Sequence, residues 1–138
     1  MLSGMRFTYN GTEFGLYDDA EAVVGKLGEQ VRPSEKFTPC VGNSGEMDQY
    51  FYKGFSISAD ANGKIRQITL NEWDAPDDGC ATVIGIKLGS SADDVKAALG
   101  EPSDENEGQI EYKDADRVYS FSFSEEGTAV YIYVGDLN

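Results

Sequence analysis

Carboxylates are the most abundant reactive side chains in this sequence. The chain has 25 acidic and 11 basic residues and no histidine, which gives a formal net charge of −14. Histidine is the commonest general base and metal ligand, so Ser-His-Asp and Cys-His catalytic sites are excluded. Two carboxylates can hydrolyse a glycosidic bond, but no spacing among the acidic residues singles out an acid and a nucleophile. We therefore predict that the protein is not an enzyme.

Two acidic segments resemble cation sites. The segment Asp60-Ala61-Asn62-Gly63 begins like a calcium-binding loop, but Lys64, Arg66 and Thr69 follow in place of the later oxygen ligands and the closing glutamate. Asn-Gly is a frequent turn dipeptide, so a hairpin turn is the better interpretation. The segment Asp74-Ala75-Pro76-Asp77-Asp78 is interpreted as a solvated acidic linker. We predict no metal site and, without a glycine-rich phosphate loop, no cofactor.

The two cysteines, Cys40 and Cys80, occupy comparable positions in the two halves of the chain. Cys40 precedes the first predicted sheet segment, and Cys80 opens the linker into the second. In an extracellular protein a disulfide between them would tie the halves together, and two buried free thiols are the alternative; only geometry distinguishes the two. Two isolated cysteines without histidine are not expected to bind a metal.

The tyrosines are the remaining candidates for function, and the chain has eight of them. Tyr131 and Tyr133 alternate along the last predicted strand, and Tyr50 and Tyr52 alternate along an earlier one. Tyrosine suits the recognition of proteins and sugars because it buries a large ring at low entropic cost and keeps a hydroxyl group for hydrogen bonding. We predict that these residues bind a partner. The alternative is that the rings only pair across neighbouring strands.

An internal similarity predicts the elements that position these side chains. Residues 16–29 and 88–101 align without a gap, and each segment is followed by alternating aromatic stretches. We therefore predict an α+β fold built by tandem duplication of a helix plus an antiparallel β-meander, with the helices packed on one face of the sheet. The two units, 1–75 and 76–138, are expected to form one compact body. The identical pairs are Leu16/Leu88, Ala20/Ala92, Val23/Val95, Leu27/Leu99, Gly28/Gly100 and Glu29/Glu101.

Both helices have local start and stop signals. Asp18 and Asp19 are expected to provide the cap at the start of the first helix, and Gly28 supplies its left-handed end. The second begins with Ser91-Ala92-Asp93-Asp94, which has the spacing of a capping box, and ends at Gly100. Asn10-Gly11 predicts an N-terminal hairpin, whereas 29–47 and the segment up to Gly108 are expected to be loops. Strands are expected at 50–52, 55–58, 65–70, 82–88, 109–113, 117–124 and 128–134.

The last two predicted strands differ in their alternation. Tyr119, Phe121 and Phe123 alternate with serines, which predicts one face against the helices and one face in water. In the last strand Val130, Ile132 and Val134 alternate with Ala129, Tyr131 and Tyr133, so both faces are partly apolar. We expect the second face to be covered or used by a partner.

Residues 85–102, GIKLGSSADDVKAALGEP, carry a resemblance to known families. A glycine, a short strand, a small residue and a helix ending in Leu-Gly-Glu-Pro resemble the signature of the SmpA/OmlA (BamE-like) lipoproteins and of the tandemly repeated β-lactamase inhibitor protein-like fold. The second half is also similar to small secreted lipoproteins of Gram-positive gut bacteria. The resemblance implies envelope or extracellular residence and action by binding proteins, and it transfers no catalytic residue.

Charge and hydropathy limit the partners. A net charge of −14 disfavours nucleic acid and anionic membrane surfaces. No apolar stretch is long enough to span a bilayer, so a membrane is expected only through a lipid anchor removed from the sequence as given. We predict a non-enzymatic, extracellular or cell-envelope module that binds an unidentified protein. A binding protein for a small molecule or cell-wall glycan is the alternative, and a structural spacer is a third interpretation.

Overall fold

The computed structural model describes residues 6–9, 11–38, 45–71, 81–82, 85–114 and 117–136. It contains two helices, α1 (Ala20–Leu27) and α2 (Ala92–Leu99). The strands are β1 (Phe7–Tyr9), β2 (Thr12–Phe14), β3 (Arg32–Phe37), β4 (Met47–Tyr52), β5 (Phe55–Ala59), β6 (Ile65–Leu70), β7 (Ala81–Thr82), β8 (Asp104–Asn106), β9 (Gln109–Asp114), β10 (Arg117–Phe123) and β11 (Ala129–Asp136). None of the helices among these residues is long and apolar enough to cross a membrane.

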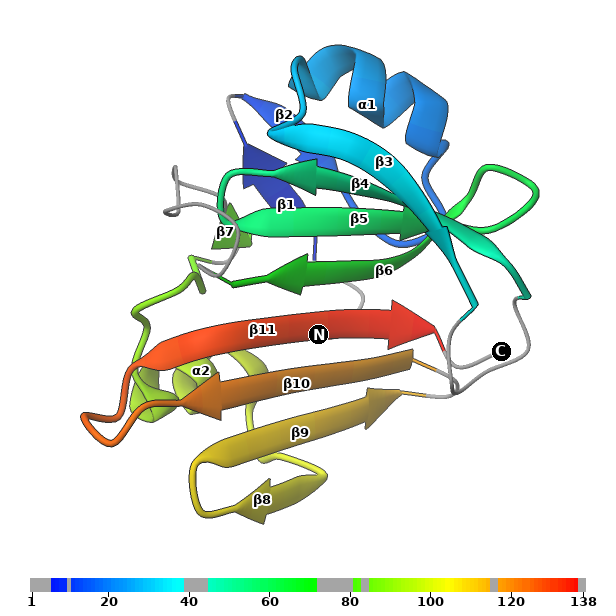
Figure 1. Ribbon diagram of the computed structural model, residues 1–138. Coiled ribbons are helices and arrows are strands. Elements are labelled where there is room, and N and C mark those ends of the chain that lie inside the picture. The colour runs from blue at the N-terminus through cyan, green and yellow to red at the C-terminus, as the bar shows by residue number, and fades with distance from the viewer. Residues whose placement is uncertain are drawn as a thin grey trace.

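The strands form two antiparallel sheets (Figure 1). The large sheet has eight strands in the order β3-β4-β5-β6-β11-β10-β9-β8, so the last strand of the chain pairs with β6 in the middle. The small sheet has the order β2-β1-β7, and its β7 belongs to the second half of the chain. The predicted unit boundary between residues 75 and 76 lies outside the described residues.

The predicted first hairpin and both predicted helices are confirmed, with one exception at the start of α1. Phe7 of β1 pairs with Phe14 of β2, and Gly11, which lies between the two strands, has a φ of +78°. Helix α1 begins after Asp19, whose side chain makes no capping hydrogen bond, so the predicted cap is absent; Gly28 follows its last residue with a φ of +89°. Helix α2 has the capping box that its sequence predicts: the Asp94 amide donates to Ser91 Oγ at 3.1 Å, and the Ser91 amide donates to Asp94 Oδ2 at 3.3 Å. Gly100 ends it with a φ of +86°.

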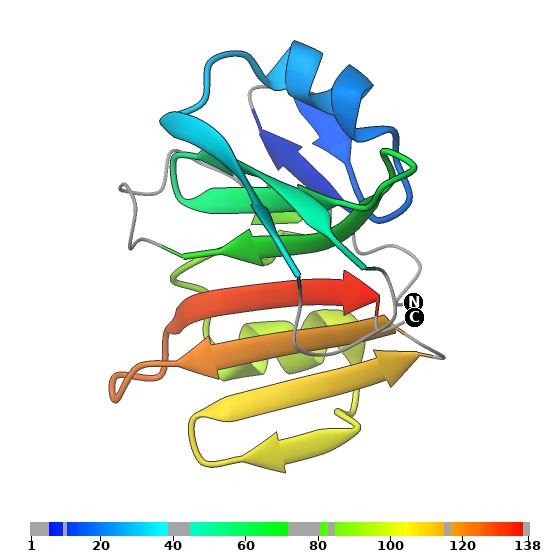
Figure 2. The same ribbon diagram turned by 45° about the vertical axis from the view of Figure 1, so that its right-hand side comes forward.

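The core lies between one face of the large sheet and a layer formed by both helices and the small sheet. Figures 1 and 2 show α2 and the β1–β2 hairpin on the same side of the large sheet. Phe55 of β5 lies 4.9 Å from Tyr9, 5.6 Å from Phe14 and 5.1 Å from Tyr52, measured between ring centroids. The aromatic rings of the small sheet therefore fill the space over β5.

The expected fold class is wrong. The chain is mainly antiparallel β, with only two helices of eight residues each, and is not an α+β protein whose helices cover the sheet. Eight strands at a spacing of about 4.8 Å make a sheet roughly 34 Å wide, whereas an eight-residue helix is only about 12 Å long. The helices therefore cover part of the sheet, and aromatic side chains of the small sheet cover another part.

Two predicted loops and one predicted strand also differ from the structure. Strand β3 lies within 29–47 and β8 lies within the segment before Gly108, where loops were expected. Both are outer strands of the large sheet, where proline and charged residues are tolerated because one side of the backbone needs no ladder partner. Of the strand expected at 82–88, the described residues contain only the end of β7 at Thr82. The other predicted strands correspond to β4, β5, β6, β9, β10 and β11.

Candidate functional site

The face of the large sheet opposite the core carries uncharged and mostly polar residues over the four central strands, β5, β6, β11 and β10. Residues directly opposite each other on antiparallel strands project to the same side. One row runs from Ser56 through Thr69 and Tyr133 to Ser120. We call this surface the serine–tyrosine face; its residues are Ser56, Ser58, Gln67, Thr69, Val118, Ser120, Ser122, Tyr131, Tyr133 and Gly135.

None of the residues of the serine–tyrosine face is charged, although 26% of the chain is. Charged side chains begin on the neighbouring strand β9, where Glu111 lies opposite Ser120 and Lys113 lies opposite Val118. Tyrosine, serine, glutamine and glycine on one surface resemble the composition of antibody binding sites, in which rigid rings supply contact area and small polar groups supply adaptable hydrogen bonds. The face is therefore chemically suited to binding a protein.

The serines form the base of this face and the longer side chains form its accessible part. Ser56, Ser58 and Ser120 are buried, whereas Tyr131 and Tyr133 are half-buried. The Ser56 hydroxyl accepts a hydrogen bond of 3.2 Å from the Gln49 amide, and the Ser120 hydroxyl donates one of 3.3 Å to Glu111. The hydroxyl groups of Ser56 and Ser120 are thus already held in place by the protein.

Tyr133 lies flat along β11. A methyl group added at Gly135 would overlap the hydroxyl and ring of Tyr133, so this glycine leaves the space that the ring occupies. Burial raises the pKa of Tyr133, and the nearby charges of Tyr131 and Asp136 raise it further. The phenol is therefore neutral at physiological pH and keeps its proton for a hydrogen bond.

The margin of the face over β4 is less accessible. Figures 1 and 2 show β3 bending across this side of the sheet. Phe51 of β4 projects to this side, opposite Ser56, and is only 2% exposed. The accessible area therefore lies over β6, β11 and β10.

The structure does not bring the predicted tyrosines together. Tyr52 lies on the core side, is 2% exposed and stacks on Phe55. Tyr50 lies opposite Ile57, also on the core side, and lines a pocket of about 410 Å³ together with Asp19 and Asp48. Tyr50 and Tyr52 thus lie on the opposite side of the sheet from Tyr131 and Tyr133.

Cys40 and Cys80 lie outside the described residues, so the predicted disulfide is not described. Among the residues that the structure does describe, no group of three or more cysteine, aspartate or glutamate side chains is arranged to hold a metal ion. The interpretation of 60–63 as a hairpin turn is confirmed. The Gly63 amide donates to the Asp60 carbonyl at 2.9 Å, and Asp60 Oδ1 accepts the amides of Asn62 and Lys64 at 2.9 and 3.0 Å.

Sequence reasoning missed an ionic cluster at the end of β11, formed by Tyr17, Asp60, Arg66 and Asp136. Arg66 donates from Nε to Asp60 at 2.8 Å and from Nη1 to Asp136 at 2.7 Å. The Tyr17 hydroxyl donates to the same Asp136 oxygen at 2.5 Å, and its ring centroid is 5.6 Å from the Arg66 guanidinium carbon. Tyr17 and Asp136 are 119 positions apart. No local sequence pattern reports such a contact.

The cluster shifts the pKa values of its members. Burial alone would raise the pKa of Asp60, but hydrogen bonds from Arg66 and from two backbone amides outweigh it and lower the pKa. Burial and the hydrogen bond to Asp136 raise the pKa of Tyr17 to about 12. Both carboxylates are almost fully buried, with side-chain exposures of 6% and 4%. The cluster therefore joins β6, β11 and the segment before α1 through charged groups that each have a partner.

No family model and no curated protein matches the chain. Among solved structures, a crystal structure of an extracellular protein containing an SCP domain from Bacillus anthracis str. Ames is similar, with a TM-score of 0.46 and 12% sequence identity. The match covers 88% of this chain and 44% of that one, so this chain spans less than half the length of that protein. A likeness this distant assigns neither a family nor a function.

Proposed function

We propose that this protein is a non-enzymatic interaction module that binds another protein through the serine–tyrosine face. The observation that supports this proposal is that none of the described residues on this face is charged, although the protein has a net charge of −14. A solvated sheet face normally carries charged residues, and protein interfaces are depleted of them at their centre. The acidic surroundings favour a partner whose own margin is basic.

Tyr131 and Tyr133 are the expected anchors of this interface. They are neighbours on one side of β11, and the face around them is formed by small hydroxyl-bearing residues. Tyrosines in the centre of an interface commonly account for about 2 kcal/mol or more of binding free energy each when truncated. The two rings pack on buried serines, which restricts their motion before binding. Little conformational entropy is therefore lost when a partner binds.

The alternative, a binding protein for a small molecule or glycan, needs a pocket lined by the same tyrosines. Of three pockets bounded by described residues, one is lined by Tyr50 and none by Tyr131 or Tyr133. No observation therefore favours this alternative over protein binding.

We place the interaction outside the cell or in the cell envelope. The resemblance of residues 85–102 to envelope lipoproteins supports this location. Fractionation of the producing cells, followed by immunodetection in cytosol, envelope and culture fluid, tests it. Detection in the cytosol alone would contradict it.

Affinity capture with matched variants tests the binding face. The native chain and the variant Tyr131→Ala/Tyr133→Ala are used as baits for envelope and culture-fluid proteins, and the affinity of each retained protein is then measured in purified form. We expect the double variant to bind at least about 30-fold more weakly, the ratio that corresponds to about 2 kcal/mol. The control is Val31→Ser/Val130→Ser, which truncates two other exposed apolar residues and should leave affinity unchanged.

Thermal unfolding of each bait must first show that it is folded. Equal affinity of the native chain and the tyrosine variant would contradict the proposal. If no protein is retained and a panel of cell-wall glycans binds in a manner that depends on Tyr131 and Tyr133, the glycan alternative replaces it.

A further inference from the structure

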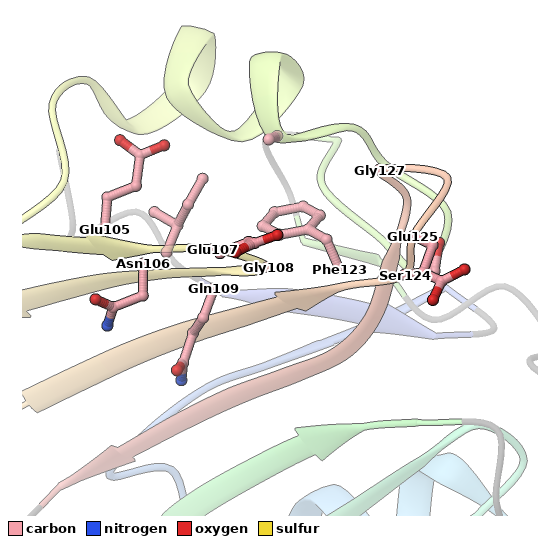
Figure 3. A pocket seen from close by; sticks show the side chains of 11 residues that line it. Glu105, Asn106, Glu107, Gly108, Gln109, Phe123, Ser124, Glu125 and Gly127 are labelled. Atoms are coloured by element: carbon pink, nitrogen blue, oxygen red, sulfur yellow. The ribbon is translucent and has the colours of Figure 1, made fainter.

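A second candidate site lies on the α2 side of the large sheet, away from Tyr131 and Tyr133. It is a pocket of about 380 Å³ between the β8–β9 turn, the β10–β11 turn and the first residue of α2. Figure 3 shows Glu105 and Phe123 projecting toward the helix, whereas Asn106 and Gln109 project to the opposite side. The side of the pocket that faces α2 is thus formed in part by the ring of Phe123 and the carboxylate of Glu105.

The interior of this pocket is apolar. Ala92, Ile110 and Phe123 line it. Ile110 is 2% exposed and belongs to the hydrophobic core, and Phe123 packs against that core while keeping part of its ring accessible. An aliphatic chain that enters the pocket would therefore contact apolar surface on the side of the core.

The rim of the pocket is acidic. Glu105, Glu107 and Glu125 line it, and all three are exposed. Glu105 is paired with Lys96 of α2 at 2.7 Å, whereas Glu107 and Glu125 form no ion pair with any described residue. Asp93 and Asp94 in the first turn of α2 add further negative charge on the helix side. The pocket therefore has more carboxylates than cations around it, and it disfavours an anionic ligand.

We propose that this pocket binds a lysine or arginine side chain of a polypeptide partner. Such a side chain has an aliphatic stem that packs on apolar surface and a cationic head that remains near water. The stem would lie against Ile110 and Phe123, and the head would meet Glu107 and Glu125 at the rim. A cation is also attracted to the face of an aromatic ring such as Phe123. The inference does not rest on the proposed function, because the two sites share no residue.

The test is a titration of the isotope-labelled chain with two small probes. Binding is measured from the changes in amide chemical shifts in nuclear magnetic resonance spectra. The probes are Nα-acetyl-lysine methylamide and its uncharged counterpart of similar length, Nα-acetyl-norleucine methylamide. We expect the lysine probe to cause saturable shifts at Gly108, Phe123 and Gly127, and the norleucine probe to bind about tenfold more weakly. Equal binding of both probes, or no saturable shift at these amides, would overturn the proposal.

Matched charge variants separate a specific site from general attraction to an acidic protein. Glu107→Gln/Glu125→Gln removes two carboxylates from the rim. Glu101→Gln/Glu126→Gln removes two exposed carboxylates that do not line the pocket, one of them from the same turn. We expect the rim variant to weaken binding of the lysine probe about fivefold and the control to leave it unchanged. Equal weakening in both variants would show only the effect of net charge and would also overturn the proposal.

Discussion

Two turns of the large sheet, between β5 and β6 and between β10 and β11, have the same backbone hydrogen bond but different side chains. In the first, the Asp60 amide donates to the Lys64 carbonyl at 2.9 Å; in the second, the Ser124 amide donates to the Thr128 carbonyl at 2.9 Å. Each turn is followed by a β-bulge, and Arg66 and Val130 are the extra residues at the two bulges. Each turn is also bridged to the residue before a helix, Asp19 with Lys64 and Ser91 with Thr128.

The side chains at these corresponding positions do different things. At the first turn, Asp60 and Arg66 belong to the ionic cluster with Tyr17 and Asp136. At the second turn, the hydroxyls of Ser124 and Thr128 hydrogen-bond at 3.0 Å, and Val130 is 45% exposed. The second turn has the same backbone hydrogen bond with Ser124 and Val130 at the positions of Asp60 and Arg66, so the ionic cluster is not needed for the turn itself. It serves instead to hold the end of β11 against β6.

The segment before each helix shows the same contrast. Tyr17 has a φ of +73°, and Gly89, at the corresponding place before α2, has a φ of +95°. The amides of Tyr17 and Gly89 each donate to a carbonyl, that of Ile65 and that of Ala129, at 2.8 Å. A tyrosine in this conformation is strained by roughly 1–2 kcal/mol relative to glycine. The strained backbone at Tyr17 places the Tyr17 hydroxyl within hydrogen-bond distance of Asp136, and this hydrogen bond offsets part of the strain.

Among the variants considered, replacement of Arg66 should lower the free energy of unfolding the most. Arg66→Met leaves Asp60 and Asp136 without their shared cation, and we expect the free energy of unfolding at pH 7 to fall by about 3 kcal/mol, as for a broken buried ion pair. Val130→Met at the corresponding bulge should change it by less than about 0.5 kcal/mol, because that side chain is exposed. Urea unfolding of the three proteins measures both values.

The pH dependence gives this prediction an internal control. The folded pKa of Asp60 is lowered from its ordinary value of 3.8, so its contribution is present above that value and is lost as the pH falls below it. The stability difference between the native chain and Arg66→Met should therefore narrow below about pH 4. Similar losses for Arg66→Met and Val130→Met would contradict the distinction between the two turns.

A smaller effect is expected from two tyrosines at corresponding positions of β4 and β9. The Tyr112 hydroxyl donates to the carbonyl of Gly100 at the end of α2 at 2.8 Å, whereas the buried Tyr52 hydroxyl has no hydrogen-bond partner among the described residues. Tyr112→Phe should lower the free energy of unfolding by about 1 kcal/mol. Tyr52→Phe should leave it unchanged or raise it, because it removes a buried polar group without a partner. Chemical unfolding compares the two, and a larger loss for Tyr52→Phe would contradict the assignment.

Elements with local determinants could be predicted from the sequence. Asn10-Gly11, the Ser91–Asp94 capping box and the glycines at both helix ends act through neighbouring residues, and the structure has the hairpin and both helices at those places. Strands β3 and β8 could not be predicted, because their polar sequences form strands only through pairing with β4 and β9 at the edges of the sheet. The prediction of the fold class was wrong for a related reason. The sequence of a short helix does not indicate how many strands lie in the sheet that the helix packs against.

The candidate site shows the same limit. Alternation along a strand placed Tyr131 with Tyr133 and Tyr50 with Tyr52 correctly. Whether the two pairs share a face depends on the register across β4, β5, β6 and β11, which places Tyr50 opposite Ile57 and Tyr133 opposite Thr69. Register is a property of the whole sheet, and a one-residue shift reverses the face.

The smallest expected effect is that of the Tyr17 hydroxyl. Tyr17→Phe keeps the ring near Arg66 and removes only the hydrogen bond to Asp136, so we expect a loss of about 0.5 kcal/mol at pH 7 for this partly exposed group. The raised pKa gives the effect a pH dependence: the contribution is fully present below pH 10, the ordinary value for tyrosine, and is lost as the pH rises toward about 12.

Urea unfolding of the native chain and of Tyr17→Phe at pH 8 and pH 11 measures this loss. The difference between the two proteins should shrink at the higher pH, and Tyr112→Phe, which removes a hydroxyl from the second half, reports how much of the change is general. A difference that stays constant between the two pH values would mean that the Tyr17 hydroxyl does not support the ionic cluster. In that case the strained backbone at Tyr17 is stabilised only by the packing of its ring near Arg66, a contact that Gly89 cannot make because it has no side chain.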